Sequence, residues 1–410
     1  MPTAHAAARA VFVVFAASGF AFASWASRLP AVRDGLSFSE QDMGLLLLTG
    51  SIGSVAAIPL SGLVAERIGT ARTVLFSAAV LVVGLTVAGL GVAAGEHVAV
   101  RVGLVLFGVG AGVWDAAMNL EGATVEQRLG RAVMPVFHAG FSFGTVVGAG
   151  VGALVATVGV PVVWHVVGAG ALALVSVVVA VRFFSPAMVA AALPDGAAGA
   201  GAEAADPGAV TPPSGVAGLL AAWRESRTLA IGLVVLAAAL TEGVANDWVS
   251  LAVVDGFGTS DGLGAVGLAV FLTAMTAARL AGTRAIDRFG RVPVLVLSTL
   301  LAFVGVLTFA LVPYLWLALV GVALWGLGAA LGFPMGMSAA SDDPRRAAMR
   351  VAAVSTIAYT AFFVGPPLIG FVAHTTGYRL AVLVLLVPMV LGLAVARSVR
   401  PLPRPGVLRD

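Results

Sequence analysis

Two carboxylic acids stand inside long apolar runs of this chain. Asp115 and Glu242 are each followed four positions later by an amide, Asn119 or Asn246, on the same helical face. An ionised carboxylate in apolar surroundings costs several kcal/mol, so each acid needs a chemical reason to be there. We interpret both as candidates for proton or substrate coupling. The structural alternative is a protonated carboxyl group that only bonds a backbone carbonyl.

A lone histidine, His138, lies in the apolar run that follows the one containing Asp115. The two residues are about equally far from the turn that joins their runs, so antiparallel helices would hold them at similar depth. Histidine titrates near neutrality, and an Asp115–His138 pair could hold or pass a proton. His138 is therefore the third coupling candidate, and a packed core histidine is the alternative.

A short charged turn occurs twice, 221 positions apart, between long apolar runs. The chain is therefore an internal duplication. A carboxylate beside an arginine and a glycine at a helix end can hold neighbouring helix ends by hydrogen bonds that break when a gate opens. The alternative is an ordinary basic anchor. The predicted gate residues are Gly62, Glu66, Arg67, Gly69, Asp287, Arg288 and Gly290.

Aromatic residues occupy corresponding places in the two copies. Trp25 and Trp248 lie near matching ends of two apolar runs, and Tyr359 is at the position equivalent to the histidine. Tryptophans there can stack on a small organic ligand such as a sugar, with Asn119 and Asn246 supplying hydrogen bonds. An interfacial belt is the alternative for the two tryptophans.

The elements that position these groups are membrane helices. Hydrophobic residues make up 60% of the chain, charged residues 10%, and the mean hydropathy is +1.05. We predict an all-α integral membrane protein with twelve transmembrane helices in two pseudo-symmetric six-helix halves. The expected spans are 9–28, 43–64, 73–94, 98–120, 133–157, 161–183, 228–254, 263–283, 293–312, 314–339, 350–372 and 379–397.

The predicted organisation has four parts. Residues 1–184 form the first half and 228–400 the second. Residues 185–227, rich in Pro, Ala and Gly, are expected to be a flexible cytoplasmic linker, and 401–410 a cytoplasmic tail. Small residues at four-residue spacing, Gly140, Gly144, Gly148 and Gly152, predict close packing of the fifth span.

Arginine placement sets the predicted orientation. All 23 basic residues are arginine, and 18 of them fall on one side of the predicted spans. Basic residues accumulate on the cytoplasmic side, so both termini are predicted to be cytoplasmic in an inner membrane. Arg279, near one end of the eighth span, is expected to reach the interface. A signal peptide cleaved near Ala21-Phe22-Ala23 is the alternative for the start of the chain.

The loop Gly62-Leu63-Val64-Ala65-Glu66-Arg67-Ile68-Gly69, with twelve spans and a long central loop, resembles the major facilitator superfamily. Trp114 to Asn119, Phe137 to Ser142 and Glu242 to Trp248 are similar to a largely uncharacterised bacterial branch related to the fucose permeases. The loop departs from the family pattern at Glu66, where aspartate is usual, and in the positions after Gly69. The resemblance implies transport by alternating access between two halves.

Other chemistries lack their motifs. The chain has no cysteine, no phosphate-binding loop and no histidine spacing typical of a metal site, so we expect no enzyme activity, cofactor or metal. We predict a secondary active transporter of a small organic solute, monomeric and coupled to protons, with sodium as the alternative ion. Its partners would be the solute and membrane lipid, not nucleic acid. An exporter of amphiphilic compounds and a transporter-like receptor or scaffold without turnover are the rival functions.

Overall fold

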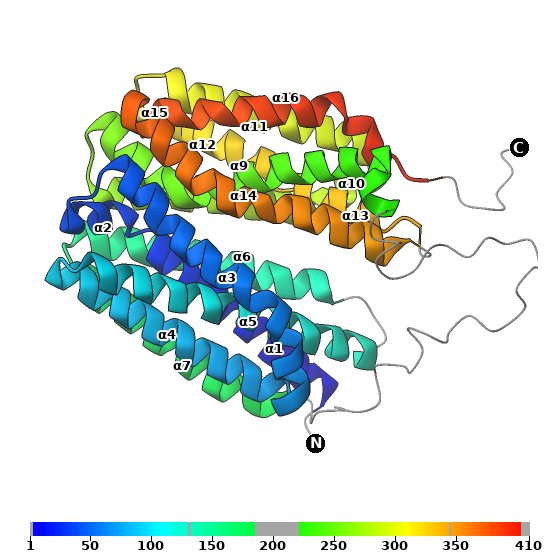
Figure 1. Cartoon of the computed structure of the whole chain (residues 1–410), viewed down its shortest axis with the longest axis horizontal. Helices are drawn as coiled ribbons and strands as arrows, with labels where there is room; N and C mark the ends of the chain where they lie inside the picture. Colours follow the sequence, from blue (N-terminus) through cyan, green and yellow to red (C-terminus); the bar gives the residue numbers. More distant parts are fainter. Residues whose placement is uncertain (1–2, 130–132, 185–220, 344–345, 403–410) are drawn as a thin grey trace, which may run out of the picture.

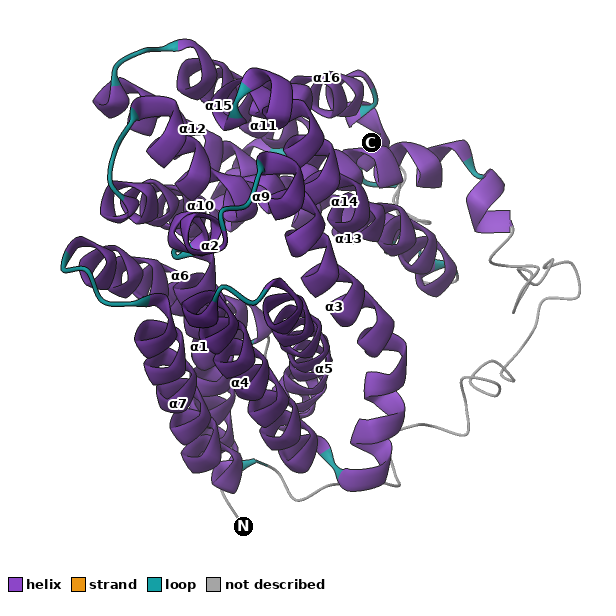
Figure 2. Cartoon of the chain, turned by 60° about the vertical axis from the view of Figure 1, so that its left-hand side comes forward, coloured by secondary structure: helices purple, strands orange, loops and turns teal. Residues whose placement is uncertain are grey.

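The computed structural model describes residues 3–129, 133–184, 221–343 and 346–402. Every regular element in that part of the chain is a helix (Figure 2). Ten helices there are long and apolar enough to cross a membrane. Helix α3 and the shorter apolar stretch Tyr378–Ala394 complete the twelve spans. The predicted all-α membrane fold is confirmed.

The first bundle holds six spans and one short helix that the sequence analysis did not predict. This extra helix, α2, begins with Leu29-Pro30, where proline fits the first helical turn. The elements are α1 (Ala4–Ala26), α2 (Leu29–Leu36), α3 (Glu40–Ile68), α4 (Thr70–Ala94), α5 (His97–Leu129), α6 (Met134–Thr157), α7 (Val162–Ala180) and the 3-10 helix η1 (Val181–Phe183).

The second bundle begins at Ser226, two residues before the predicted span. Most of the predicted linker, residues 185–220, and most of the tail lie outside the described residues. The elements are α9 (Ser226–Phe257), α10 (Asp261–Phe289), α11 (Arg291–Leu311), α12 (Leu315–Ala329), α13 (Gly332–Ala340), α14 (Ala347–Thr376), α15 (Tyr378–Ala381), η2 (Val382–Leu385), α16 (Leu386–Ala394) and η3 (Ala396–Val399).

The tenth span, expected to run unbroken over 314–339, is two helices, α12 and α13. Pro334 explains the break, because proline has no N–H to donate to the carbonyl four residues earlier, that of Ala330. Ala330 and Leu331 separate the two helices. The break thus leaves a backbone oxygen inside the bundle that needs another donor.

The two bundles meet mainly at one end of the molecule. We call this the distal end; the proximal end is the one that carries the starts of α1 and α9 (Figure 1). At the distal end, Arg33 on α2 forms an ion pair with Asp255 on α9. The His374 Nδ1 atom on α14 lies 3.4 Å from the Glu40 Oε2 atom on α3. A Cβ atom placed on Gly44 of α3 would be only 2.7 Å from the Pro366 carbonyl oxygen of α14. These contacts close the distal end.

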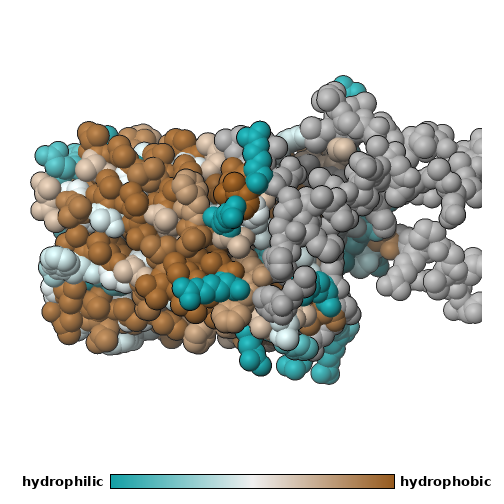
Figure 3. Space-filling model, turned by 90° about the horizontal axis from the view of Figure 1, so that it is seen from below, coloured by the Kyte–Doolittle hydropathy of each residue, from teal (hydrophilic) through white to brown (hydrophobic). Residues whose placement is uncertain are grey.

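On the face seen in Figure 3, hydrophobic side chains form a broad band over the first bundle, with most of the strongly hydrophilic residues toward its proximal limit. Exposed large apolar residues on both bundles include Phe76, Leu172, Leu297 and Val387. So much exposed apolar surface is unfavourable in water, whereas helices satisfy their backbone groups internally in lipid. The band is the surface that the fold presents to the membrane.

Candidate functional site

A cavity of about 370 Å³ lies between the two bundles. Helices α1 to α6 of the first bundle form one wall, and α9 and α14 form the other. The wall is mainly apolar, with serine, asparagine and two aspartate side chains interspersed. Its aromatic members are Phe22, Trp25, Phe107, Phe141, Tyr359 and Phe362. A space of this size fits a small organic molecule.

Asp115 lines this cavity from α5. The side-chain amide of Asn119 donates to its carboxylate at 3.3 Å and to its backbone carbonyl at 2.8 Å. Tyr359 lines the same cavity from α14 and is close enough to Asp115 for an electrostatic interaction. Asn119, predicted as a cavity residue, thus bonds to Asp115 and is not among the residues that line the described cavity.

A third acid, Asp247 on α9, also lines the cavity, and the sequence analysis gave it no role. No hydrogen bond or ion pair joins its carboxylate to another residue in the described part of the chain. The neighbouring Asn246 has a buried Oδ1 atom that also has no partner there. The sequence could have identified Asp247 as a candidate, because it is an acid inside the predicted span 228–254 just as Glu242 is.

Glu242 is held by Arg279 in a bidentate ion pair. One guanidinium nitrogen of Arg279 lies 2.9 Å and 2.8 Å from the two carboxylate oxygens of Glu242. Its Nε atom donates to the Ala330 carbonyl at 3.4 Å, the oxygen that Pro334 leaves free. The sequence analysis expected Arg279 to reach the membrane interface, and this prediction is wrong: its guanidinium group is bonded inside the bundle. It joins α9, α10 and the α12–α13 break.

His138 and Asp115 have different neighbours. The His138 ring packs edge-on against the Phe15 ring, with ring centroids 5.3 Å apart. It is also close enough to Arg279 for an electrostatic interaction. Within the described residues, no hydrogen bond joins it to Asp115. Helix α1 packs along both α5 and α6, which touch each other little. Consecutive helices need not be neighbours in space.

The two tryptophans also differ in surroundings. Trp25 lines the cavity and is 4% exposed. Trp248 is fully buried in the second bundle, where its ring lies 5.3 Å from that of Tyr378. It is not among the residues that line the described cavity, and its burial leaves no surface for an interfacial belt. Tyr359 lines the cavity beside Phe362, as predicted for a cavity residue.

The duplicated turns have the same backbone shape. Gly69 has φ 82° and ψ 156°, and Gly290 has φ 82° and ψ 164°, a conformation that favours glycine. Arg288 lies over the Phe289 ring at 5.2 Å. In the described structure neither Arg67 nor Asp287 takes part in an ion pair. The side chain of Glu66 and the surroundings of Gly62 lie outside what the structure describes.

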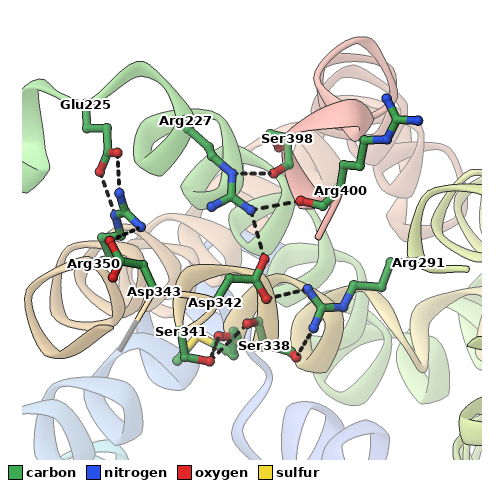
Figure 4. Close-up of polar contacts among 11 residues, drawn as sticks. Glu225, Arg227, Arg291, Ser338, Ser341, Asp342, Asp343, Arg350, Ser398 and Arg400 are labelled. Carbon is green, nitrogen blue, oxygen red and sulfur yellow. Dashed lines mark hydrogen bonds and ion pairs between the residues drawn. The ribbon is translucent and has the colours of Figure 1, made fainter. Parts of the chain in front are cut away.

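Ion pairs instead gather at the proximal end of the second bundle (Figure 4). Asp342 accepts from Arg291 at 2.7 Å and from Arg227 at 2.9 Å. Glu225 accepts from Arg350 at 2.7 Å. Burial alone would raise the pKa of Glu225, but the hydrogen bonds from Arg350 and Thr228 and the positive charges of Arg350 and Arg346 together outweigh burial and lower that pKa.

Comparison with known proteins gives the family. A family model described as Major Facilitator Superfamily matches residues 231–410. An uncharacterized MFS-type transporter of Yersinia pestis is 30% identical over 371 residues, which cover 90% of this chain and 89% of the relative.

Solved structures share the fold at low sequence identity. The nucleoside transporter NupG is 14% identical, covers 96% of this chain and 98% of its own, and superimposes with a TM-score of 0.73. The E.coli Fucose:proton symporter FucP is 15% identical over 95% of this chain and 97% of its own, with a TM-score of 0.64. The twelve-span fold, the relative and the family model agree: this chain belongs to the Major Facilitator Superfamily.

Proposed function

We propose that the protein is a secondary active transporter that moves a small organic solute through the cavity between its halves, coupled to protons. The observation that carries this proposal is the cavity itself. Both halves contribute to its wall, each with one aspartate, and interdomain contacts close it at the distal end. A site shared between two halves that rock against each other can be exposed to either side in turn.

Asp115 is the proposed proton-carrying group. Its carboxylate faces the cavity, shares one amide hydrogen bond and has no cationic partner within the described residues. A proton or a solute that binds there changes the charge of the wall that the other half must approach.

Glu242 contributes in a different way, through Arg279. Their ion pair and the Arg279–Ala330 hydrogen bond tie the cavity-lining helix α9 to the broken tenth span. We propose that loss of the charge on Glu242 releases this tie and lets α13 move. His138, beside Arg279, would respond to the same change.

The membrane orientation is also a proposal. Four arginines, Arg28, Arg33, Arg101 and Arg379, lie near the distal ends of their helices, whereas most of the others fall toward the proximal side. This distribution supports a cytoplasmic proximal end, with both termini in the cytoplasm. The duplicated turns would then act as gate elements on that side, and in the described part of this distally closed state neither Arg67 nor Asp287 forms an ion pair.

The names of structural neighbours support a small polar solute. One is a nucleoside transporter and the other a fucose:proton symporter. The aromatic wall favours a second candidate, an exporter of amphiphilic compounds, because six aromatic rings suit apolar molecules better than a sugar.

Transport in proteoliposomes tests the proposal. The full chain would be reconstituted and tested with labelled uridine, fucose and 2-phenylethylamine, with and without an imposed proton gradient. We expect gradient-driven accumulation of at least one solute. Asp115→Asn should lose accumulation but keep solute exchange, which needs no net proton movement, while the exposed Glu96→Gln control keeps both.

Other outcomes would contradict the proposal in distinct ways. Binding without movement of any solute in either condition indicates a receptor or scaffold. Accumulation confined to amphiphilic compounds and to the export orientation indicates the second candidate.

A further inference from the structure

The described cavity wall has two acids and no basic side chain. Asp115 comes from the first bundle and Asp247 from the second, and no arginine or histidine is among the lining residues. The wall is therefore negative when both acids are ionised.

A strong positive charge inside the second bundle, that of Arg279, is already engaged. Arg279 forms two hydrogen bonds to Glu242 and a third to the Ala330 carbonyl. The Arg279 charge is matched by the carboxylate of Glu242, so it leaves the two aspartates uncompensated. His138 is turned against Phe15 and does not line the cavity.

The polar groups of the wall around Asp247 are acceptors that lack donors. Asp247 has no partner within the described residues, and the Asn246 Oδ1 atom is buried without one. Leaving a buried acceptor unpaired costs about 1–3 kcal/mol, and more if it is charged. A ligand that brings N–H donors and a positive charge would satisfy the Asp247 carboxylate, whereas an anion would be repelled.

The rest of the wall suits the same kind of ligand. Aromatic side chains from α1 and α14, including Trp25 and Tyr359, line the same space. The faces of aromatic rings attract cations, with tryptophan the strongest, and also stack on flat apolar groups. Aromatic faces and carboxylates in one cavity therefore select for a cation that has an apolar body.

We propose that this cavity binds a small organic cation, an amine with a flat apolar group, and that Asp247 and Asp115 supply its countercharge. The inference rests on the proposed function, because it names the class of solute that the transporter would carry. Asp247, bare of other partners, is the main anchor, and Asp115 is the second. The aromatic side chains hold the apolar part.

Binding to the purified full chain in detergent tests this without any transport step. The probes are 2-phenylethylamine, which is a cation at neutral pH, 2-phenylethanol, its neutral analogue, and phenylacetate, an anion of similar size. Ligand-dependent thermal stabilisation at increasing concentration gives the affinity of each. We expect the amine to bind at least about tenfold more tightly than either analogue, which corresponds to about 1.4 kcal/mol.

Variants identify the anchors. Asp247→Asn and Asp115→Asn, close to isosteric with the wild type, should each weaken amine binding about tenfold or more, and Glu96→Gln should leave it unchanged. The unfolding temperature without ligand shows whether each variant is folded. If a variant is unstable, Asp247→Glu, which keeps the charge, should retain the preference for the amine over the alcohol.

Two results would overturn the proposal: equal affinity for the amine and the alcohol, or wild-type amine affinity in both folded asparagine variants. Its failure differs from failure of the proposed function. Transport of a neutral solute with no preference for the amine contradicts only the cation site. Selective amine binding without accumulation in proteoliposomes contradicts only active transport.

Discussion

Helices α1 and α6 in the first half occupy the places that α9 and α14 take in the second, yet the two pairs pack differently. Gly144 on α6 and Gly365 on α14 are 221 positions apart, the spacing of the duplicated turn. A Cβ on Gly144 would overlap the Ala16 carbonyl oxygen on α1, because the two backbones touch. A Cβ on Gly365 would meet only side chains, that of Leu240 at 3.4 Å and that of Val244 at 3.9 Å.

Charge shows the opposite trend. The second half contains the Glu242–Arg279 pair and the Asp342 network. At the positions matching Arg291 and Asp342, the first half has Thr70 and Glu121, joined by one hydroxyl hydrogen bond. The repeat has thus preserved where helices meet but not the interactions that hold them. At these matched positions the described first half is joined by a hydroxyl hydrogen bond and the second half by ion pairs that can rearrange.

The largest expected effect comes from breaking the Glu242–Arg279 ion pair, which has no counterpart among the ion pairs described in the first half. Arg279→Met leaves Glu242 partly buried and unpaired, and should lower the free energy of unfolding by up to about 3–5 kcal/mol. The double variant Glu242→Gln with Arg279→Met should recover part of this loss. Unfolding of the wild type, the single variants Arg279→Met and Glu242→Gln, and the double variant in one detergent gives the coupling energy. Additive losses would show that the pair contributes nothing.

The glycine pair should show the next effect. Gly144→Ala should destabilise the protein by about 1–3 kcal/mol, because the backbone of α1 must move away. Gly365→Ala has room and should lie within about 0.5 kcal/mol of the wild type. Thermal unfolding of both variants checks this difference. Equal losses would mean that the two helix pairs pack alike.

A smaller difference is expected at the matched proximal positions. Arg291→Ala removes an ion pair with Asp342 and a hydrogen bond to Ser338, and should cost about 1–2 kcal/mol. Thr70→Ala removes one hydroxyl hydrogen bond and should cost about 1 kcal/mol or less. The same unfolding assay measures both. A larger loss for Thr70→Ala would reverse the proposed division between the halves.

The smallest effect concerns acid stability. The pKa of Glu225 is lowered in the folded protein, so its contribution is present above its ordinary value of 4.5 and disappears as the pH falls below it. Because the carboxylate remains partly exposed, we expect less than about 1 kcal/mol. Arg350→Gln should reduce the fall in unfolding temperature on acidification. An identical pH profile for variant and wild type would contradict this account.

Hydropathy was sufficient to predict the twelve spans, because each must cover the bilayer core. The break in the tenth span could also have been predicted, since Pro334 has no N–H to donate to the Ala330 carbonyl. A constant spacing of 221 residues does not hold throughout the two halves. Gly84 faces Gly103, 19 positions later, whereas the corresponding Gly305 faces Gly321 after only 16. At the proximal end the two halves are in register again, because Arg291 and Asp342 are as far apart in sequence as Thr70 and Glu121. The three-residue difference therefore arises between Gly321 and Asp342, the interval that contains the helix break.

The site was only partly predictable. Asp115, Trp25 and Tyr359, proposed from their place in the apolar runs and in the repeat, line the described cavity. The direction in which a residue faces depends on which helices lie beside it. That information is absent from the spacing, which is why Trp248 entered the list of cavity residues and the surroundings of His138 were not foreseen.

The most direct test of alternating access is to lock the distal end. The chain has no cysteine, so Arg33→Cys and Asp255→Cys can be introduced together into an otherwise thiol-free protein. These positions join the two halves in the distally closed state. Joining them with a short cleavable thiol cross-linker should abolish uptake into proteoliposomes, and cleavage should restore it, while each single variant given the same treatment keeps its activity. Undiminished uptake by the fully cross-linked protein would contradict the account.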